Sequence, residues 1–85
     1  MADEKVGRVV KFFVKPSVAA IEVTDGTIKT GDLLRFKGHT TDFTEQIQSM
    51  QVENKAVDEA PQGSMVGIKV KERVREHDEV YKVVD

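Results

Sequence analysis

The stretch from residue 26 to residue 44 reads GTIKTGDLLRFKGHTTDFT, and the rest of the chain is organised around it. Two turns are expected within it, at Gly26 and at Thr30-Gly31-Asp32. Glycine adopts positive φ without steric cost, and an aspartate side chain can bond its own backbone and fix a turn. The second turn leads into a strand in which Leu34 and Phe36 face a core, and Gly38 is expected to end it.

Further strands are predicted on both sides of this stretch, because apolar residues alternate between short turn signals. In the first of them Val10, Phe12 and Val14 are predicted to face the core. The predicted strands cover residues 6–15, 19–23, 34–37, 44–52, 65–70 and 79–84.

Ile47 and Met50 are separated by an odd step, so a regular strand cannot place both in one core. A β-bulge near Gln48 or Ser49 would correct the alternation. A helix is the alternative, because Phe43, Ile47 and Met50 also fit helical spacing. The strand with a bulge is favoured.

A short internal repeat supports the turns. Residues 28–34 (IKTGDLL) and residues 74–80 (VREHDEV) share an apolar residue, a cation, two turn residues, an aspartate and the start of a strand. Each aspartate is expected to bond its own turn. The pattern as a whole predicts an all-β fold, a small barrel or sandwich.

Length and composition predict one domain over residues 6–85, preceded by a flexible N-terminus over residues 1–5. The 85 residues include no cysteine and carry a net charge of −2. A cytoplasmic location is expected, since there is no apolar leader and no apolar run long enough to cross a bilayer. No membrane partner is expected.

Four motifs in sequence order resemble the second domain of translational GTPases such as elongation factor Tu. They are Gly26-x-Ile28-Lys29-x-Gly31-Asp32 followed by Leu34-x-Phe36, Ile47-x-Ser49-Met50, Ala60-x-x-Gly63-x-x-Val66-Gly67-Ile68, and Asp78-x-Val80. The resemblance implies a small six-stranded Greek-key antiparallel β-barrel in which residues 47–50 form a strand. His77 departs from it, since these barrels usually carry glycine at that position.

Residues 37–44 (KGHTTDFT), 66–70 (VGIKV) and 80–83 (VYKV) resemble the C-terminal barrel of collagenase-like peptidase-family proteins, some of which are tied to RNA hydroxylation. Free-standing barrels of this kind resemble translation elongation factor-like proteins. The resemblance implies contact with tRNA, the ribosome or a neighbouring domain, without chemistry of its own.

No phosphate-binding loop of the type G-x-x-x-x-G-K-[ST] is present, so no bound nucleotide and no GTPase activity are expected. With two histidines and no cysteine, no metal site or other cofactor is expected either. His39 and Asp42 lie three residues apart and could form a general-base pair, but a loop whose Thr40, Thr41 and Asp42 cap their own backbone is favoured. The chain is therefore predicted not to be an enzyme.

Recognition is the better functional hypothesis. Lys11, Phe13 and Lys15 alternate on one strand and Arg35 and Lys37 on another, which suits phosphates and an unpaired RNA base. Together with the loop, the candidate binding residues are Lys11, Phe13, Lys15, Arg35, Lys37, His39, Thr40, Thr41 and Asp42. The predicted partner is RNA (tRNA or rRNA) or the ribosome. The alternative is a protein, with the chain acting in trans with a peptidase-family or RNA-modifying enzyme.

Overall fold

The computed structural model describes residues 2–84, and within them the chain is all-β, as predicted. Eight strands form one antiparallel sheet in the order β5-β4-β10-β1-β2-β9-β6-β7, and β3 pairs with β8 in a second, small sheet. The ten strands are β1 (Ala2–Phe13), β2 (Val18–Val23), β3 (Thr27–Lys29), β4 (Leu33–Lys37), β5 (Asp42–Gln46), β6 (Met50–Val52), β7 (Lys55–Val57), β8 (Glu59–Pro61), β9 (Met65–Lys69) and β10 (Glu79–Val84).

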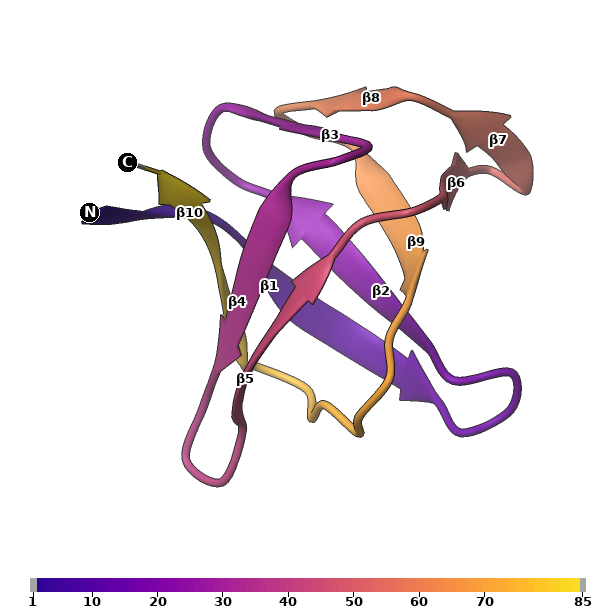
Figure 1. The fold of residues 1–85 in the computed structure, drawn as a ribbon. Helices are drawn as coiled ribbons and strands as arrows, with labels where there is room; N and C mark the ends of the chain where they lie inside the picture. The colour runs from indigo at the N-terminus through magenta and orange to yellow at the C-terminus, as the bar shows by residue number, and fades with distance from the viewer. Residues whose placement is uncertain (1, 85) are drawn as a thin grey trace.

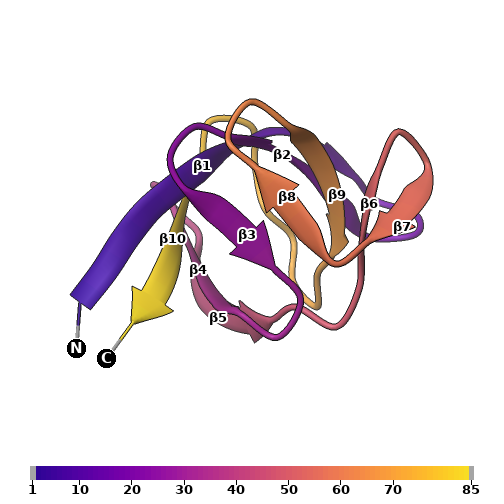
Figure 2. The same cartoon turned by 90° about the horizontal axis from the view of Figure 1, so that it is seen from above.

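The large sheet curls strongly, and β3 and β8 lie across one end of it (Figure 1). Figure 2 looks down on that end and shows the two short strands in the foreground. The β1–β2 loop, the β4–β5 loop and the β9–β10 connection lie at the opposite end (Figure 1). The first and last described residues lie beside each other, because Ala2 pairs with Val84.

The interior of the curl is filled by one apolar cluster. The rings of Phe36 and Phe43 stack with centroids 5.0 Å apart and an interplanar angle of 21°. Their strands place them in direct register, which brings the two largest core side chains of this hairpin together. The buried apolar residues are Val6, Val9, Ala19, Ile21, Val23, Ile28, Leu34, Phe36, Phe43, Ile47, Met50, Ala60, Val66, Ile68, Val70, Val74 and Val80.

The predicted strands correspond to the longer strands β1, β2, β4, β5, β9 and β10. The strand predicted over residues 44–52 covers both β5 and β6. Six strands underestimate the total, since β3, β7 and β8 have only three residues each and fall in stretches too short to show alternation. In the ladders of residues 2–84, β5 and β7 remain the edges of the large sheet. Greek-key closure into a six-stranded barrel stays a prediction.

The predicted inward set of β1 is wrong at two of its three positions. Val9 is buried and Phe12 packs against the core, whereas Val10 is only partly buried and Val14 is 68% exposed. The ladder between β1 and β2 shifts between Val9 and Lys11, so one extra residue is inserted at Val10. Such a bulge reverses the alternation, so β1 faces the core with Val9 before it and with Phe12 after it.

The N-terminal segment predicted to be flexible belongs to β1 from Ala2 onward; Met1 lies outside the described residues. Ala2, Asp3, Glu4 and Lys5 pair with Val84, Val83, Lys82 and Tyr81 of β10. Ladder hydrogen bonds to β10 do not require apolar side chains, so a polar segment can extend the strand.

The region from Thr44 to Val52 is extended, and the helix alternative is wrong. A break at residues 47–49 separates β5 from β6 and takes the place of the expected bulge. Ile47 exchanges backbone hydrogen bonds with the second turn, from Gly31 N at 2.8 Å and to Asp32 O at 2.9 Å. This break lets both Ile47 and Met50 enter the core.

The internal repeat forms two matching turns. Lys29 N donates to Asp32 Oδ2 at 2.9 Å, and Arg75 N donates to Asp78 Oδ2 at 2.8 Å. The residue before each aspartate has positive φ, 92° at Gly31 and 75° at His77. The turns lead into β4 and β10, which pair with each other.

Each turn also contacts the far end of the partner strand. Lys82 Nζ near the end of β10 lies 3.2 Å from Asp32 Oδ2 before β4. The carboxylate of Asp78 before β10 lies against Gly38 at the end of β4, where any Cβ would collide with it. Gly38 is therefore required by this close approach.

Replacing His77 with glycine is expected to raise the free energy of unfolding by up to about 1 kcal/mol. Left-handed φ costs a side chain about 1–2 kcal/mol, and the added chain entropy of glycine offsets part of the gain. Denaturant unfolding measures the change. His39→Gly is the matched control, since His39 has no positive φ, and it is expected to destabilise. A destabilised His77→Gly variant contradicts the prediction.

Gly38→Ala is expected to lower the free energy of unfolding by about 1–3 kcal/mol, because the new methyl group overpacks against Asp78. In an Asp78→Ala background the same substitution should cost much less, and the two unfolding experiments form a double-mutant cycle. An equal loss in both backgrounds would show that the carboxylate is not the obstacle.

Candidate functional site

Lys11 and Phe13 lie on the outer face of β1, as predicted, and Lys15 is exposed in the loop that follows. The Phe13 ring is 44% exposed, and Lys11 Nζ lies 5.2 Å from its centroid. The cation lies over the ring and is attracted by the negative charge of the aromatic face. An exposed aromatic face with a positive charge beside it is thus available to a partner.

The outer face beside Phe13 is shallow. Phe13 lies in register with Val18 of β2, which in turn is opposite Lys69 of β9. In the next row Lys11 is opposite Ala20, which is opposite Gly67. Because alternate residues of paired strands share a face, these rows form a low apolar floor bordered by two lysines.

The β9–β10 connection adds two arginines that the sequence analysis did not identify. Arg73 and Arg75 line a hollow of about 320 Å³ together with Lys11, Phe12, Val14, Val74 and Glu76. The signal was present in the sequence: Lys69, Lys71, Arg73 and Arg75 alternate along residues 69–75, while Val70 and Val74 are buried. The connection is anchored to the β1–β2 loop, since Ser17 Oγ donates to Val70 O at 2.8 Å.

Ion pairing divides the cations into two groups. Of the thirteen Lys and Arg residues, only Lys5, Arg8, Arg35 and Lys82 lie within 4.0 Å of a carboxylate among residues 2–84. Six of the others gather on and beside the β1–β2 loop and the β9–β10 connection. We call Lys11, Lys15, Lys69, Lys71, Arg73 and Arg75 the basic cluster.

The predicted patch of Arg35 and Lys37 differs from the basic cluster, because Arg35 is paired with a carboxylate. Arg35 forms two hydrogen bonds with Asp42, Nε–Oδ1 at 3.1 Å and NH2–Oδ2 at 3.2 Å, and its NH1 lies 3.5 Å from Asp3. Lys37 is exposed on the same face. A partner would have to displace Asp42 to reach Arg35, so this patch attracts anions less than the basic cluster does.

The predicted polar loop over residues 39–42 is only partly exposed to solvent. His39 and Thr40 are exposed, whereas Thr41 is 5% exposed and accepts a hydrogen bond from Gly38 N at 2.7 Å through its carbonyl. The prediction that Thr41 is a contact residue is therefore corrected: it closes the hairpin. Asp42 is bonded to Arg35, and the hydrogen bonds of residues 2–84 include none between His39 and Asp42.

Two negative findings apply to the described residues. Residues 2–84 contain no cluster of three or more His, Cys, Asp or Glu side chains suited to a metal ion. In the same part of the chain, no helix is long and apolar enough to cross a membrane.

A titratable trio lies on the outer face of β1 and β10. Tyr81 Oη donates to Glu79 Oε1 at 2.7 Å, and Lys5 Nζ donates to Glu79 Oε2 at 3.2 Å. The Tyr81 hydrogen bond, and then the Lys5 contacts, hold the pKa of Glu79 below its ordinary value. The same bond to Glu79 raises the pKa of the Tyr81 phenol.

Tyr81→Phe is expected to raise the pKa of Glu79 toward its ordinary value, because the main donor to the carboxylate is lost. A lowered folded-state pKa stabilises the protein above the ordinary pKa of Glu, and this contribution disappears as the pH falls through the folded-state pKa. The variant should therefore be less stable at neutral pH, with the difference shrinking in acid.

NMR titration of the Glu79 carboxyl carbon measures this shift directly. Lys5→Met serves as the comparison and should raise the pKa less. A Glu79 titration curve that Tyr81→Phe leaves unchanged would contradict the assignment.

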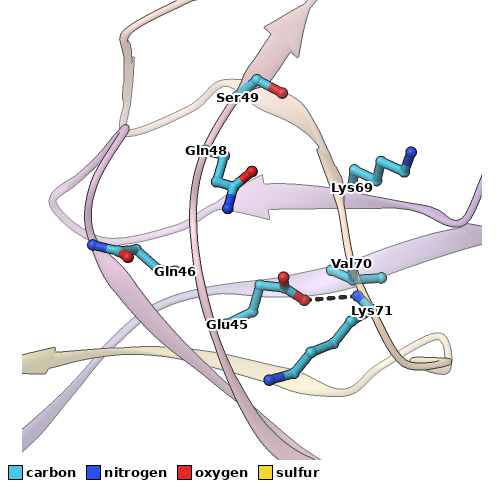
Figure 3. Close-up of a pocket in the computed structure, with 7 residues that line it drawn as sticks. All are labelled: Glu45, Gln46, Gln48, Ser49, Lys69, Val70 and Lys71. Atoms are coloured by element: carbon cyan, nitrogen blue, oxygen red, sulfur yellow. Dashed lines mark hydrogen bonds between the residues drawn. The ribbon is translucent and has the colours of Figure 1, made fainter.

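A second hollow, of about 290 Å³, lies between the end of β5 and the end of β9 (Figure 3). Its lining residues are Glu45, Gln46, Gln48, Ser49, Lys69, Val70 and Lys71. The backbone N–H of Lys71 donates to Glu45 Oε1 at 2.6 Å across the opening. Residues 69–75 thus link the two hollows.

These features define a small all-β module built on a curled antiparallel sheet. The chain belongs to the family described as elongation factor Tu domain 4, whose model matches residues 3–81. The resemblance to elongation factor Tu-type domains inferred from the four motifs is confirmed.

Relatives of this chain include longer proteins. It is 44% identical over 78 residues to an uncharacterized protease of Methanocaldococcus jannaschii, covering 91% of this chain and 19% of that protein. It is 32% identical over 78 residues to a collagenase of Porphyromonas gingivalis, covering 91% of this chain and 22% of the relative. The chain thus spans about a fifth of the length of the curated relatives it matches.

Solved structures share the fold. The C-terminal domain of a Geobacillus thermoleovorans protein assigned to the U32 peptidases has a TM-score of 0.87 at 23% identity, covering 95% of this chain and 93% of that one. GDP-bound aIF5B from Aeropyrum pernix has a TM-score of 0.67 at 19% identity, covering 98% of this chain and 14% of that one.

Proposed function

We propose that this chain is a non-enzymatic RNA-binding module of the translation-factor type, acting in the cytoplasm on single-stranded parts of tRNA or rRNA. One observation carries the proposal: six cations without an ion-pair partner among residues 2–84 lie on the β1–β2 and β9–β10 segments, and one of them, Lys11, lies 5.2 Å from the exposed ring of Phe13. Unpaired cations attract phosphates, and an exposed ring offers a stacking surface to an unpaired base.

The arrangement of the cluster favours a backbone-tracking mode. Lys69, Lys71, Arg73 and Arg75 follow one another along the β9–β10 connection, while Lys11 and Lys15 approach from the β1–β2 side. The proposed module is rigid, with the sheet closing into the Greek-key barrel expected from the sequence. Rigid support matters because a site that is ordered before binding loses less entropy on association.

The absence of catalysis in this proposal rests on the polar loop. Asp42, the acid that would orient His39, is instead engaged by Arg35 through two hydrogen bonds. The His39–Asp42 pair that would orient a general base is therefore not formed among residues 2–84.

A protein-interaction module is the second candidate, and the relatives favour it. The protease and the collagenase that match this chain carry the matching region as about a fifth of a longer protein. In this alternative the chain acts in trans with a peptidase-family or RNA-modifying enzyme. Pull-down from native lysate distinguishes the two, because RNase abolishes capture only where RNA mediates it.

Arg73→Ala/Arg75→Ala is expected to weaken binding of a single-stranded rRNA fragment about tenfold at low salt. The slope of log K against log salt should become shallower by about 1.4, because each lost phosphate contact removes about 0.7. Mobility-shift titrations at several salt concentrations measure both quantities.

Lys29→Ala/Lys55→Ala is the matched control, since it removes two cations that pair with no carboxylate of residues 2–84 and lie outside the basic cluster, and it should change binding little. Phe13→Ala should reduce the preference for single strands over duplex, because stacking contributes roughly 1–3 kcal/mol per base. The proposal fails if the wild-type chain does not bind at low salt, or if the control pair weakens binding as much as the arginine pair.

A further inference from the structure

The hollow between β5 and β9 exists because the hydrogen-bond ladder between β6 and β9 is only two residue pairs long. The β6–β9 pairing includes only Met50 with Ile68 and Gln51 with Gly67. Beyond these pairs, residues 46–49 and 69–71 run past each other without a ladder, and the hollow opens between them (Figure 3). Backbone groups on this edge of residues 69–71 therefore need other partners.

Lys71 N is the donor that faces this hollow. Val70 uses its backbone on the β2 side, where its N–H donates to Ser17 O at 3.0 Å and its carbonyl accepts from Ser17 Oγ at 2.8 Å. Successive peptide groups of an extended chain point to opposite sides, so the N–H of Lys71 points toward β5. It finds the carboxylate of Glu45 at 2.6 Å.

Glu45 is unusual for its position. It lies between the buried Phe43 and Ile47 on the core-facing parity of edge strand β5, where an apolar residue is expected. Its carboxylate crosses the opening and is held by the Lys71 backbone, with Lys69 and Lys71 on the same rim (Figure 3). The hollow thus already binds an anion, supplied by the chain itself.

The opening suits an anionic group and excludes another strand. A glutamate side chain reaches roughly 5 Å from Cα to its oxygens, and a single such side chain bridges the two segments. Inserting a strand requires flanking strands about 9.6 Å apart, twice the ladder spacing. A volume of about 290 Å³ nevertheless greatly exceeds the roughly 30 Å³ of one water, so a phosphate group has room.

We propose that this hollow is a phosphate subsite of the RNA path and that Glu45 occupies it in the free chain as a competing anion. This inference rests on the proposed RNA-binding function. A phosphodiester has non-bridging oxygens that accept hydrogen bonds as a carboxylate does, so it replaces Glu45 at the Lys71 N–H and pairs with Lys69 and Lys71. Residues 69–71 line this subsite and residues 73–76 line the hollow of Arg73 and Arg75, so one chain segment contributes to both.

Removing Glu45 is therefore expected to strengthen RNA binding. Glu45→Ala should raise affinity for the single-stranded rRNA fragment about five- to tenfold at low salt, because a like charge leaves the phosphate position. The salt slope should become steeper by about 0.7, since one phosphate contact is gained.

Glu72→Ala is the matched control. It also removes one negative charge, next to Lys71 in the sequence. Among residues 2–84, however, the side chain that accepts from Lys71 N is that of Glu45 and not that of Glu72. It is expected to raise affinity about twofold at most and to leave the slope unchanged. Equal gains from Glu45→Ala and Glu72→Ala overturn the subsite, because they reduce the effect to net charge.

A readout without RNA separates this inference from the proposed function. In Glu45→Ala, titration with inorganic phosphate should move the Lys71 amide resonance in ¹⁵N–¹H NMR spectra, and the wild-type resonance should stay in place. An unmoved Lys71 amide in the variant overturns the subsite even where the wild type binds RNA. If the Lys71 amide of the variant responds to phosphate but the chain does not bind RNA, the hollow is an anion site. Its proposed place on an RNA path is then wrong.

Glu45→Gln provides a second variant if Glu45→Ala does not fold. Glutamine keeps an acceptor for Lys71 N but carries no charge, so its affinity gain should lie between the wild type and Glu45→Ala. A Glu45→Gln protein with wild-type affinity and wild-type salt slope also overturns the proposal.

Discussion

The fold depends on one kind of hydrogen bond, which an aspartate carboxylate accepts from the backbone N–H three residues earlier. Asp32 and Asp78 each accept it, and each opens one of the neighbouring strands β4 and β10. The arrangement is reciprocal: Lys82 near the end of β10 reaches Asp32, while Gly38 at the end of β4 leaves room for Asp78. Two short turns therefore set the register of the strand pair, and β5 and β1 extend the sheet on either side.

The curled sheet separates two kinds of surface. On the face of β4, β10 and β1, cations are paired with acids: Arg35 with Asp42, and Lys5 with Glu79. Around the β1–β2 loop and the β9–β10 connection, cations outnumber acids and are not paired among residues 2–84. A net charge of −2 conceals this contrast, because attraction of an anion depends on local charge within a Debye length.

Features that depend on local residues, such as turns and strand faces, could be predicted from the sequence. Features that depend on pairing between distant strands could not. The two aspartate turns, the inward faces of β2 and β9, and the outward Lys11 and Phe13 follow from turn chemistry and alternation. The bulge at Val10 could not be read from β1, because it is defined by the partner strand. Arg73 and Arg75 were missed because Glu72 and Glu76 make the segment look like a solvated turn, and only the burial of Val74 reveals its outward face.

The pairing of Ala2 with Val84 has a mechanical consequence. Strands β1 and β10 run antiparallel with their ends together, so a tether pulling on both ends would load their hydrogen bonds one after another. Hydrogen bonds that are loaded one after another break at low force. Hydrogen bonds that are loaded together in shear break only at higher force. When tension acts through both ends, the first element lost is the β1–β10 pair, and Lys5 and Glu79 separate with it. The hairpin loop that carries Phe13 to Lys15 lies at the far end of β1 and would be among the last parts of that strand to feel the load.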